Sequence, residues 1–237
     1  MKANKKPKVA IVIPAYNEAA VIGDVIKSVK QKIKKENFEI KIVVVDDGST
    51  DETAKISKKR NVVVISHILN SGSGSATATG LSYAYQQGFD IAVTMDADGQ
   101  HDPSDVVKGI KKITKNKSDL LIGSRLINSK GMGKTKVVGN RGLSMITFLI
   151  FGVMVTDSQS GLRVFSKKSL EKLKWKSSGY EFCSEMLWRA KQTGLKIDEY
   201  QIKAIYTDYS KSKGQNNWNS VNIIKALLQR RIMEIFS

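Results

Sequence analysis

The sequence predicts an α/β protein with a mostly parallel central sheet. One observation is a series of short apolar runs, rich in β-branched residues and bounded by turn residues. Another is that helix-like segments separate these runs, which is the order of βαβ units. The composition agrees, because 41% hydrophobic and 26% charged residues in a chain of 237 are typical of one globular domain. The predicted strands are Val9–Ile13, Ile40–Val45, Val62–Ile65, Ile91–Met95 and Leu120–Ile122.

Helices are predicted in the intervals between these strands. The first is expected from Glu18 to Lys35, where apolar residues recur on one helical stripe. Residues that commonly cap or open helices mark two further starts, at Ser49, Thr50 and Asp51 and at Pro103, Ser104 and Asp105.

The alternation becomes irregular after Gly123. A Gly/Lys-rich segment, INSKGMGKTKVVGNRG, precedes an apolar stretch that ends at Val155. A short segment LRVF, a helix near 181–193, a strand near 196–206 and a C-terminal helix then follow. Because no repeat or low-complexity linker separates this part from the rest, we predict a single domain over residues 1–237.

The charge balance points to an anionic partner. Lys and Arg number 39 against 22 Asp and Glu, a formal net charge of +17, which permits nucleic acid, phosphorylated substrates or acidic lipid headgroups. One cysteine and two histidines exclude a disulfide framework and a Cys- or His-rich metal centre, so any metal must be held by carboxylates.

Membrane-spanning and secretory segments are not expected. The longest apolar stretch, Met145–Val155, is well short of the ~18 residues that a spanning helix needs. The apolar run near the N-terminus soon meets Pro14 and Asn17, so a first strand and a cytoplasmic location are predicted.

Acidic residues stand where two of the predicted strands end. Asp46 and Asp47 follow one apolar run, and Asp96 and Asp98 follow another with Gly99 behind them. Ligands of open α/β sheets bind beyond the carboxyl ends of strands. Carboxylates there can hold a hard cation, which in turn would neutralise the phosphates of a nucleotide.

Individual residues argue against three other interpretations of these motifs. A calcium loop is rejected because Val107 stands where a bidentate glutamate belongs. A phosphotransferase with Asp96 as nucleophile is disfavoured, because that motif opens its domain, whereas three strands precede it here. A dinucleotide-binding loop at Asn70–Gly80 is rejected because Thr77 replaces the third glycine.

The ordered set of motifs resembles a known family. VAIVIPAYNE, VVVDDGSTDET, NSGSGSATATG and MDADGQ look like the nucleotide-sugar-binding half of a family 2 glycosyltransferase of GT-A fold. IGSR, NRG, TDSQSGLRVF and YEFCSE extend the likeness toward the dolichyl-phosphate mannose synthase-like group. The resemblance implies a nucleotide-sugar-binding half at 1–124 and an acceptor half at 125–237.

The resemblance also implies roles for individual residues. Those expected to bind the donor nucleotide are Pro14, Ala15, Tyr16, Asn17, Glu18, Asp46 or Asp47, Asp96, Lys211 and Lys213. Those expected to hold Mg²⁺ or Mn²⁺ are Asp96, Asp98 and Gln100. The group often has a basic residue where this chain has Ser73, so a diphosphate contact from that loop is not predicted.

Arginines are the expected ligands of the acceptor phosphate, because a guanidinium matches phosphate geometry. Arg125 and Arg141 stand at the positions that serve this purpose in polyprenyl-phosphate transferases, and Arg163 is a third candidate. A phosphate acceptor needs little general-base help, whereas a sugar hydroxyl acceptor would need a base, for which Glu185 is the first candidate and Asp157 and Glu181 are the others.

The sequence therefore predicts an inverting, metal-dependent glycosyltransferase that moves a hexose from a UDP- or GDP-sugar to a polyprenyl phosphate, with Asp98, Arg125, Arg141, Asp157 and Glu185 as catalytic candidates. The alternative enzymatic function is transfer to a sugar hydroxyl of a lipid-linked glycan. The alternative non-enzymatic function is binding of a polyanion such as nucleic acid. No nucleic-acid partner is expected.

Peripheral attachment at the cytoplasmic face of a membrane is also expected, directly or through a small membrane protein. The apolar segment Leu143–Val155 is the predicted entry site of the lipid. The C-terminal helix, with Ile224 and Leu228 on one face, is left open between a membrane-surface helix and core packing.

Overall fold

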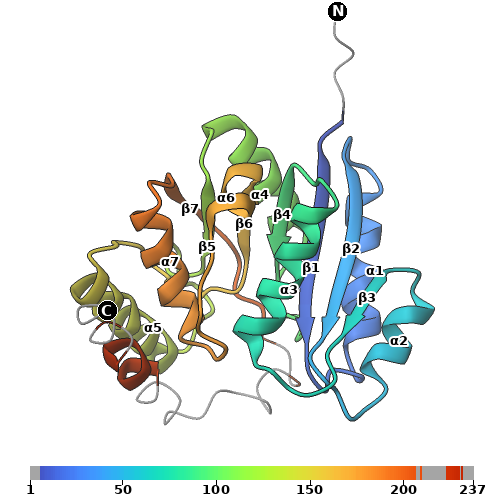
Figure 1. The fold of residues 1–237 in the computed structure, drawn as a ribbon, viewed down its shortest axis with the longest axis horizontal. Helices are drawn as coiled ribbons and strands as arrows, with labels where there is room; N and C mark the ends of the chain where they lie inside the picture. The colour runs from blue at the N-terminus through green and yellow to red at the C-terminus, as the bar shows by residue number, and fades with distance from the viewer. Residues whose placement is uncertain (1–5, 207–208, 210–222, 230, 232–237) are drawn as a thin grey trace, which may run out of the picture.

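A computed structural model describes residues 6–206, 209, 223–229 and 231. One seven-stranded sheet runs through the molecule in the order β3-β2-β1-β4-β6-β5-β7 (Figure 1). The strands are β1 (Lys8–Ala15), β2 (Glu39–Asp46), β3 (Val63–Ser66), β4 (Ile91–Thr94), β5 (Leu120–Ser124), β6 (Arg163–Ser166) and β7 (Ile197–Gln201).

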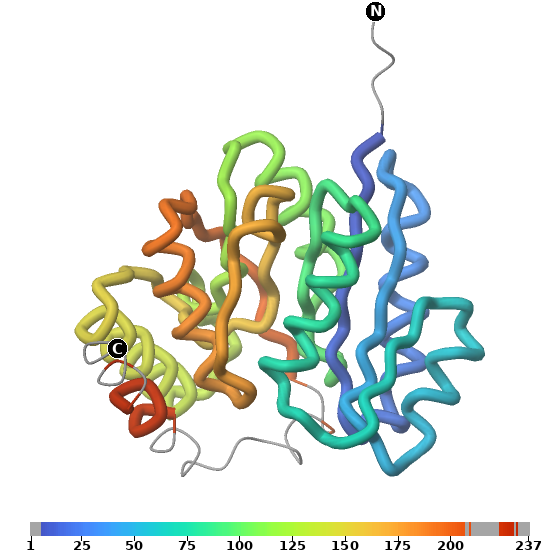
Figure 2. The backbone as a smooth tube through the Cα atoms, viewed as in Figure 1, coloured from blue at the N-terminus to red at the C-terminus, as the bar shows by residue number. Residues whose placement is uncertain are grey.

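The sheet is mostly parallel, as predicted. β1 pairs in parallel with β2 and with β4, β2 with β3, and β5 with β7. Among the described strands only β6 is antiparallel, and it lies between β4 and β5 although it follows both in the chain (Figure 2). Because of this insertion, residues from both ends of the chain share one sheet.

Helices cover both faces of the sheet. The described helices are α1 (Ile22–Ile33), α2 (Thr53–Lys59), α3 (Ser73–Gln86), α4 (Pro103–Asn116), α5 (Lys134–Phe151), α6 (Lys167–Lys172) and α7 (Phe182–Gln192). α1 and α4 pack into one apolar cluster with alternate residues of the central strands. α3, α5, α6 and α7 contribute to a second cluster on the other face. The central strands are therefore buried from both sides, which explains their nearly continuous apolar runs.

The start of α4 shows how the local sequence fixes a helix. Asp102 is the N-cap and accepts a hydrogen bond from the Ser104 amide, and Pro103 occupies the first turn. Val106 and Ile110 are fully buried on the inner face of this helix. The predicted start at Pro103 is confirmed.

The Gly/Lys-rich segment differs from expectation. α5 begins at Lys134 and runs through Gly139 and Gly142, so the NRG motif is helical. A methyl group at either glycine would meet no atom within 4 Å, which places both on an open side of the helix. Leu143 and Phe151 are buried farther along, and tertiary packing of that half overrides the poor helix propensity of glycine.

The strand expected near 196–206 is shorter, ending at Gln201, and it forms an outer edge of the sheet. Its backbone is capped by two lysines of α4. Lys112 Nζ donates to the carbonyl of Glu199 at 2.7 Å, and Lys108 Nζ donates to that of Gln201 at 2.5 Å.

The predicted C-terminal helix is described at 223–229. Ile223 and Leu227 are buried in the second cluster, whereas Leu228 is 46% exposed. Ile224, from the predicted apolar face, is partly buried against the same cluster. The described part of this helix therefore packs on the core. Lys211 and Lys213 lie outside the described residues.

In the part of the chain that the structure describes, no helix combines the length and the apolar character needed to cross a bilayer.

Candidate functional site

The carboxyl ends of the parallel strands bring the predicted site residues to one edge of the sheet. Ala15, the last residue of β1, is in register with Asp46, the last residue of β2. β4 ends at Thr94, two residues before Asp96, and β5 ends at Ser124, next to Arg125. Strand direction alone thus brings the loop after β1, both acidic motifs and Arg125 to the same side of the molecule.

The loop after β1 is held by hydrogen bonds to the start of the β2–α2 connection. Asn17 has a left-handed backbone, and its amide donates to Ser49 Oγ at 2.9 Å. The Glu18 amide donates to Thr53 Oγ1 at 2.8 Å. Tyr16 is 42% exposed at the tip of this loop. Pro14 and Ala15 belong to β1 itself, so they can offer only backbone and ring surface.

Asp46 and Asp47 have different surroundings. Asp47 Oδ1 lies 2.7 Å from His67 Nδ1 and accepts from the Ser71 amide at 3.0 Å, while its Oδ2 accepts from the Gly72 amide at 2.8 Å. Among the described residues, the Asp46 carboxylate accepts only a 3.3 Å bond from the Ser49 amide. Asp47 therefore organises the β3–α3 loop, and Asp46 keeps the freer carboxylate.

The glycines after β3 are explained by close packing rather than by phosphate binding. A methyl group at Gly74 would lie 2.5 Å from the carbonyl oxygen of Ser177, and one at Gly72 would lie 2.4 Å from that of Ser178. At Gly80, the clash would be with the Val12 side chain at 2.2 Å. The Gly-rich loop thus lets α3 approach β1 and the 177–178 segment.

The Asp96 carboxylate stands at the end of β4 in contact with two neighbours. His101 Nε2 lies 3.0 Å from its Oδ2, and His101 itself is buried. A methyl group at Gly161 would come within 2.2 Å of Asp96 Oδ1, and the Gly161 carbonyl is held by Thr94 Oγ1 at 2.8 Å. The side chain of Asp96 is nonetheless 54% exposed, so it is fixed in direction and open to a ligand.

Asp98 and Gln100 are coupled to each other. Asp98 Oδ2 accepts from Gln100 Nε2 at 2.5 Å, and Oδ1 accepts from the Gln100 amide at 2.9 Å. Burial, and then the negative charge of Asp96, raises the pKa of Asp98. Two carboxylates that repel each other in this way are suited to share a cation.

The pKa of Asp96, unlike that of Asp98, is lowered by its surroundings. Desolvation would raise the pKa of Asp96, but it is outweighed by the hydrogen bond and charge of His101 acting together with two nearby arginines. The guanidinium groups of Arg125 and Arg163 add to this effect, so the pKa of Asp96 is lowered.

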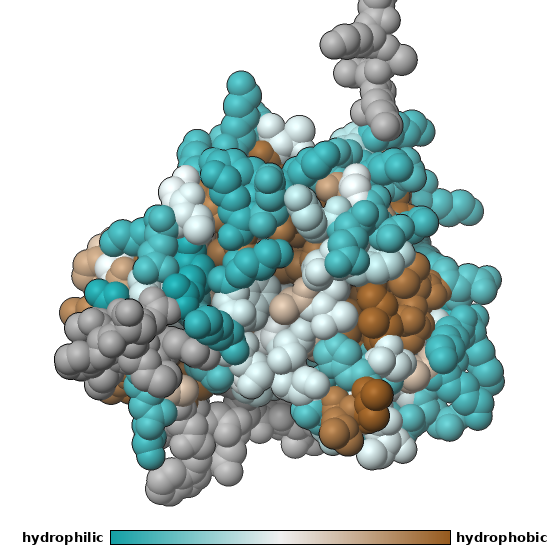
Figure 3. Space-filling view, in the orientation of Figure 1, coloured by the Kyte–Doolittle hydropathy of each residue, from teal (hydrophilic) through white to brown (hydrophobic). Residues whose placement is uncertain are grey.

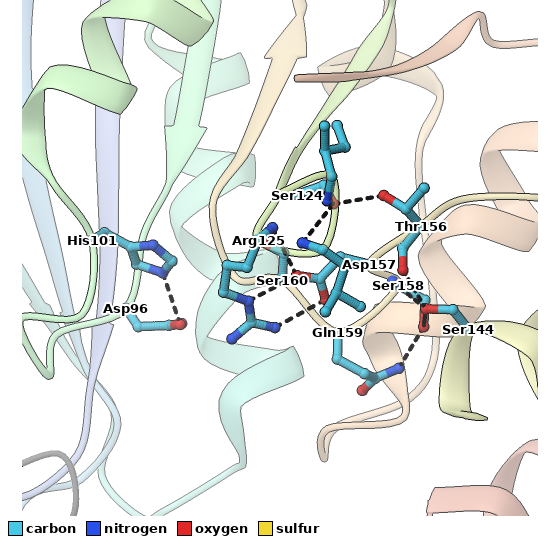
Figure 4. A network of polar contacts seen from close by, with 12 residues as sticks. Asp96, His101, Ser124, Arg125, Ser144, Thr156, Asp157, Ser158, Gln159 and Ser160 are labelled. Carbon is cyan, nitrogen blue, oxygen red and sulfur yellow. Dashed lines mark hydrogen bonds and ion pairs between the residues drawn. The ribbon is translucent and has the colours of Figure 1, made fainter. Parts of the chain in front are cut away.

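Arg125 and Asp157 form an ion pair with three hydrogen bonds. Asp157 Oδ2 accepts from the Arg125 amide at 3.1 Å and from Nε at 2.7 Å, and Oδ1 accepts from Nη2 at 2.9 Å. Burial would lower the pKa of Arg125, but the charge and hydrogen bonds of Asp157, together with the charge of Asp96, outweigh burial and raise the pKa, so the guanidinium stays charged. Figure 4 shows this guanidinium and the Asp96 carboxylate turned toward the same space.

A polar chain supports the ion pair from behind. The Thr156 hydroxyl lies 2.6 Å from Ser124 Oγ, and the Thr156 amide donates to both carboxylate oxygens of Glu199 at 2.9 and 3.0 Å. This clamps the residue before Asp157 between β5 and β7. The orientation of Arg125 is thus fixed by the sheet itself.

Arg163 is fully buried and serves the local structure. It donates to the carbonyls of Ser158, Ser160 and Cys183. These bonds shape the loop that contains Asp157 and Gly161. Among the described residues, Ser160 Oγ makes no hydrogen bond although it is buried.

Glu185 is also completely buried. Its oxygens accept from the amides of Lys176 at 3.1 Å and Ser177 at 2.8 Å, and from the Ser177 hydroxyl at 2.5 Å. Arg189 lies 3.3 Å away as an ion-pair partner. These contacts tie α7 to the segment that packs on Gly72 and Gly74. Arg141, by contrast, is exposed on α5.

The sequence interpretation missed the histidines. The chain has two, and each pairs with a strand-terminal aspartate, His67 with Asp47 and His101 with Asp96. Both histidines follow strands, β3 and β4, that end at this edge of the sheet. Their contact with the acidic residues could have been predicted from that position, because side chains of neighbouring loops lie close together there. No cluster of three or more His, Cys, Asp or Glu within the described residues is arranged to hold a metal by itself.

The chain is similar to known proteins in sequence and in fold. Residues 10–174 match the model of glycosyl transferase family 2. The chain is 44% identical to the uncharacterized protein MJ1222 of Methanocaldococcus jannaschii, over 96% of this chain and 93% of that one. It is also 44% identical to the UDP-N-acetylglucosamine–dolichyl-phosphate N-acetylglucosaminyltransferase of Methanococcus voltae, over 95% and 96% of the two chains.

A solved structure confirms the fold. Glucosyl-3-phosphoglycerate synthase from Mycobacterium tuberculosis, crystallised with Mn²⁺, UDP and glucosyl-3-phosphoglycerate, superposes with a TM-score of 0.71 at 20% identity, covering 95% of this chain and 80% of that one. The expected GT-A fold is confirmed, and the non-enzymatic alternative is set aside. With its acidic strand ends and fixed arginine at one sheet edge, this chain is a glycosyltransferase and belongs to glycosyl transferase family 2.

Proposed function

We propose that this glycosyltransferase moves a sugar from a nucleotide diphosphate donor to the phosphate of a polyprenyl lipid, with inversion at the anomeric carbon. The observation that carries the proposal is the state of two of the three candidate bases. Asp157 and Glu185 are both completely buried, and their oxygens are occupied by Arg125 and by the 176–177 backbone. Neither is arranged to deprotonate a sugar hydroxyl, whereas an acceptor phosphate is already an anion.

The donor nucleotide would lie beyond β1 and β2. Tyr16 offers an exposed ring for the base or ribose, and Asp46 is the better-placed of the two acids to accept a hydrogen bond from the base. Asn17 and Glu18 shape the loop around them. Roles for Lys211 and Lys213 on the diphosphate remain predictions outside the described residues.

A divalent cation fits the donor set at Asp96 and Asp98. Mg²⁺ and Mn²⁺ are commonly bound through one or two carboxylates, with the remaining positions filled by water and substrate phosphates. The mutual repulsion of Asp96 and Asp98 favours such an ion, and Gln100 would hold Asp98 in place or contribute its own oxygen. When bound, the ion would supply positive charge for the departing diphosphate.

The residues of this chain would then align the acceptor. Arg125 Nη1 makes no hydrogen bond among the described residues, and it is the nitrogen left over after Asp157 has fixed Nε and Nη2. It would bind the acceptor phosphate beside the donor diphosphate. A phosphate oxygen attacks the anomeric carbon from the side opposite the leaving group. The bond from that carbon to the diphosphate breaks, and the nucleoside diphosphate leaves with the electron pair.

The sugar and the base are best approached through the Methanococcus voltae relative. Its name gives UDP-N-acetylglucosamine as donor and dolichyl phosphate as acceptor. Identity of 44% over almost the whole chain supports this pair as the first to test. GDP-sugars are the alternative among donors.

The surface of α5 supports the proposal of peripheral membrane contact. Val138, Met145 and Leu149 are 70%, 58% and 72% exposed, and their spacing places them on one side of the helix. Lys134 and Lys136 are exposed on the first turn, where they can meet anionic headgroups. A small membrane protein partner is a further possibility that the same face could serve.

The proposal is tested by incubating purified protein and Mn²⁺ with detergent-solubilised polyprenyl phosphate and radiolabelled UDP- or GDP-sugars. Lipid-extractable label that disappears with EDTA is expected. Arg125→Ala and Arg141→Ala should raise the KM for the acceptor while leaving donor affinity by calorimetry unchanged. Label transferred only to a saccharide acceptor would overturn the proposal in favour of a hydroxyl acceptor.

A further inference from the structure

The β3–α3 loop presents two large aliphatic side chains to solvent. Ile68 is 97% exposed and Leu69 is 75% exposed. They follow His67 directly beyond the carboxyl end of β3, and are therefore on the same edge of the sheet as Asp46, Asp96 and Arg125. Figure 3 shows apolar surface at this lower edge of the molecule.

Polar contacts on both sides of Ile68 and Leu69 hold the loop in this exposed conformation. His67 before it and the amides of Ser71 and Gly72 after it all bind the carboxylate of Asp47. The His67 amide also donates to the carbonyl of Asp46 at 2.8 Å, and the Ser71 hydroxyl donates to that of Leu69. The backbone is thus fixed while its two apolar side chains point away from the protein.

The loop also packs against the turn after β2. A methyl group at Gly48, whose φ is +71°, would lie 2.6 Å from the Leu69 carbonyl carbon and 2.7 Å from the Asn70 nitrogen. Only glycine allows this approach. The loop therefore rests on the same turn that carries Asp46 and Asp47, so its tip has a fixed position relative to the donor site.

We propose that Ile68 and Leu69 insert into the interfacial layer of the membrane that contains the acceptor. The inference rests on the proposed function, because a lipid phosphate can reach Arg125 only if this sheet edge faces the bilayer. Two side chains are too small for a stable protein interface, which buries about 800 Å² per partner, whereas insertion into lipid needs only a few side chains.

Charge on the same edge fits an anionic lipid surface. The first turn of α5 lies near the site, because Lys136 Nζ is 4.5 Å from the Tyr206 ring and the neighbouring Ile205 amide donates to the Gln100 carbonyl. Lys134 and Lys136 are exposed there. The lysines of α5 and the aliphatic loop tip would contact the bilayer on either side of the catalytic residues.

The experiment places a fluorescent probe on the loop. Cys183, the only cysteine, is buried, so a thiol-reactive NBD dye should label Ile68→Cys selectively. Gln87→Cys, exposed at the other end of α3, is the matched control. Vesicles of phosphatidylglycerol and phosphatidylcholine should shift the emission of the dye to shorter wavelength at position 68 and not at position 87.

Substitutions give a second measurement. Ile68→Ser with Leu69→Ser should weaken vesicle affinity about tenfold or more, whereas Ile68→Leu with Leu69→Ile should bind as the original does. Turnover of the serine variant with a detergent-solubilised acceptor should stay normal, and only turnover on vesicles should fall. Vesicle binding needs no turnover, so failure of the transfer reaction in detergent would count against the proposed function alone.

Three outcomes would overturn the inference. The first is vesicle binding without a spectral change at position 68, which would assign membrane contact to another surface. The second is no vesicle binding at all. The third is a spectral change without vesicles that grows with protein concentration, which would assign the loop to contact between copies of the chain.

Discussion

Replacing Asp157 with alanine should destabilise the protein strongly, because it leaves Arg125 without its counter-ion. The Asp157 carboxylate has no exposed surface, and the Arg125 side chain is 18% exposed. Three hydrogen bonds of 2.7–3.1 Å are lost with the carboxylate. The guanidinium remains in the protein with its positive charge only partly hydrated.

Removing one partner of a buried ion pair costs about 3–5 kcal/mol. A domain of this size loses roughly 2–4 °C of Tm for each kcal/mol, so a decrease of roughly 6–20 °C is expected. The free energy of unfolding of most domains is about 5–15 kcal/mol, which means that the variant should still fold at room temperature.

Thermal unfolding followed by circular dichroism gives the Tm, and a double-mutant cycle isolates the pair. Asp157→Ala and Arg125→Ala should each destabilise, while the double variant should be more stable than the sum of the two effects implies. Glu199→Gln serves as a control that weakens the support of Thr156 without touching either charge. Additive effects of the two alanine substitutions, or a Tm change under 2 °C for Asp157→Ala, would refute this account of the pair.

Three further predictions concern the site and its surroundings. Asp98→Asn should abolish Mn²⁺-dependent turnover yet keep or raise the Tm of the metal-free protein, because it removes repulsion with Asp96; turnover near the original level would contradict the metal role. Gly161→Ala should displace the Asp96 carboxylate and lower turnover about 100-fold. The Mn²⁺ affinity, measured by electron paramagnetic resonance, should also fall. An unchanged affinity would show that this contact does not hold the carboxylate in place. Burial raises the pKa of Cys183 from 9.0 to about 11, so the thiol of the folded protein should resist Ellman's reagent at pH 8. Stability should fall as the pH rises from 9.0 to about 11, because the thiol of the unfolded chain ionises first. Rapid stoichiometric labelling at pH 8 would disprove the burial of this thiol.

The sheet edge with its acidic residues could be predicted from sequence because strand signals are local. β-branched apolar runs ending in Asp46 and in Asp96 specify both a strand and the place where it stops. Parallel pairing then brings these ends together without further information. The family resemblance added the roles that spacing alone left open.

Other features depend on contacts that no local pattern encodes. The insertion of β6 between β4 and β5 is a topological choice made by packing. The different environments of Asp46 and Asp47 arise from the position of His67, twenty residues after Asp47. The helical state of the NRG motif was missed because glycine propensity argues against it, whereas the buried far half of α5 decides the outcome.

Lys108 and Lys112, the two lysines of α4 that donate to the carbonyls of β7, affect the solubility of the protein rather than its chemistry. An outer strand with unpaired carbonyl groups is a template onto which a strand of another molecule can add. Here the carbonyls of Glu199 and Gln201 are occupied by ammonium groups, and any incoming strand would meet positive charge before it met a hydrogen-bond acceptor. Part of the large basic excess of this chain thus keeps its copies from joining edge to edge, and removing these two lysines should promote aggregation before it affects turnover.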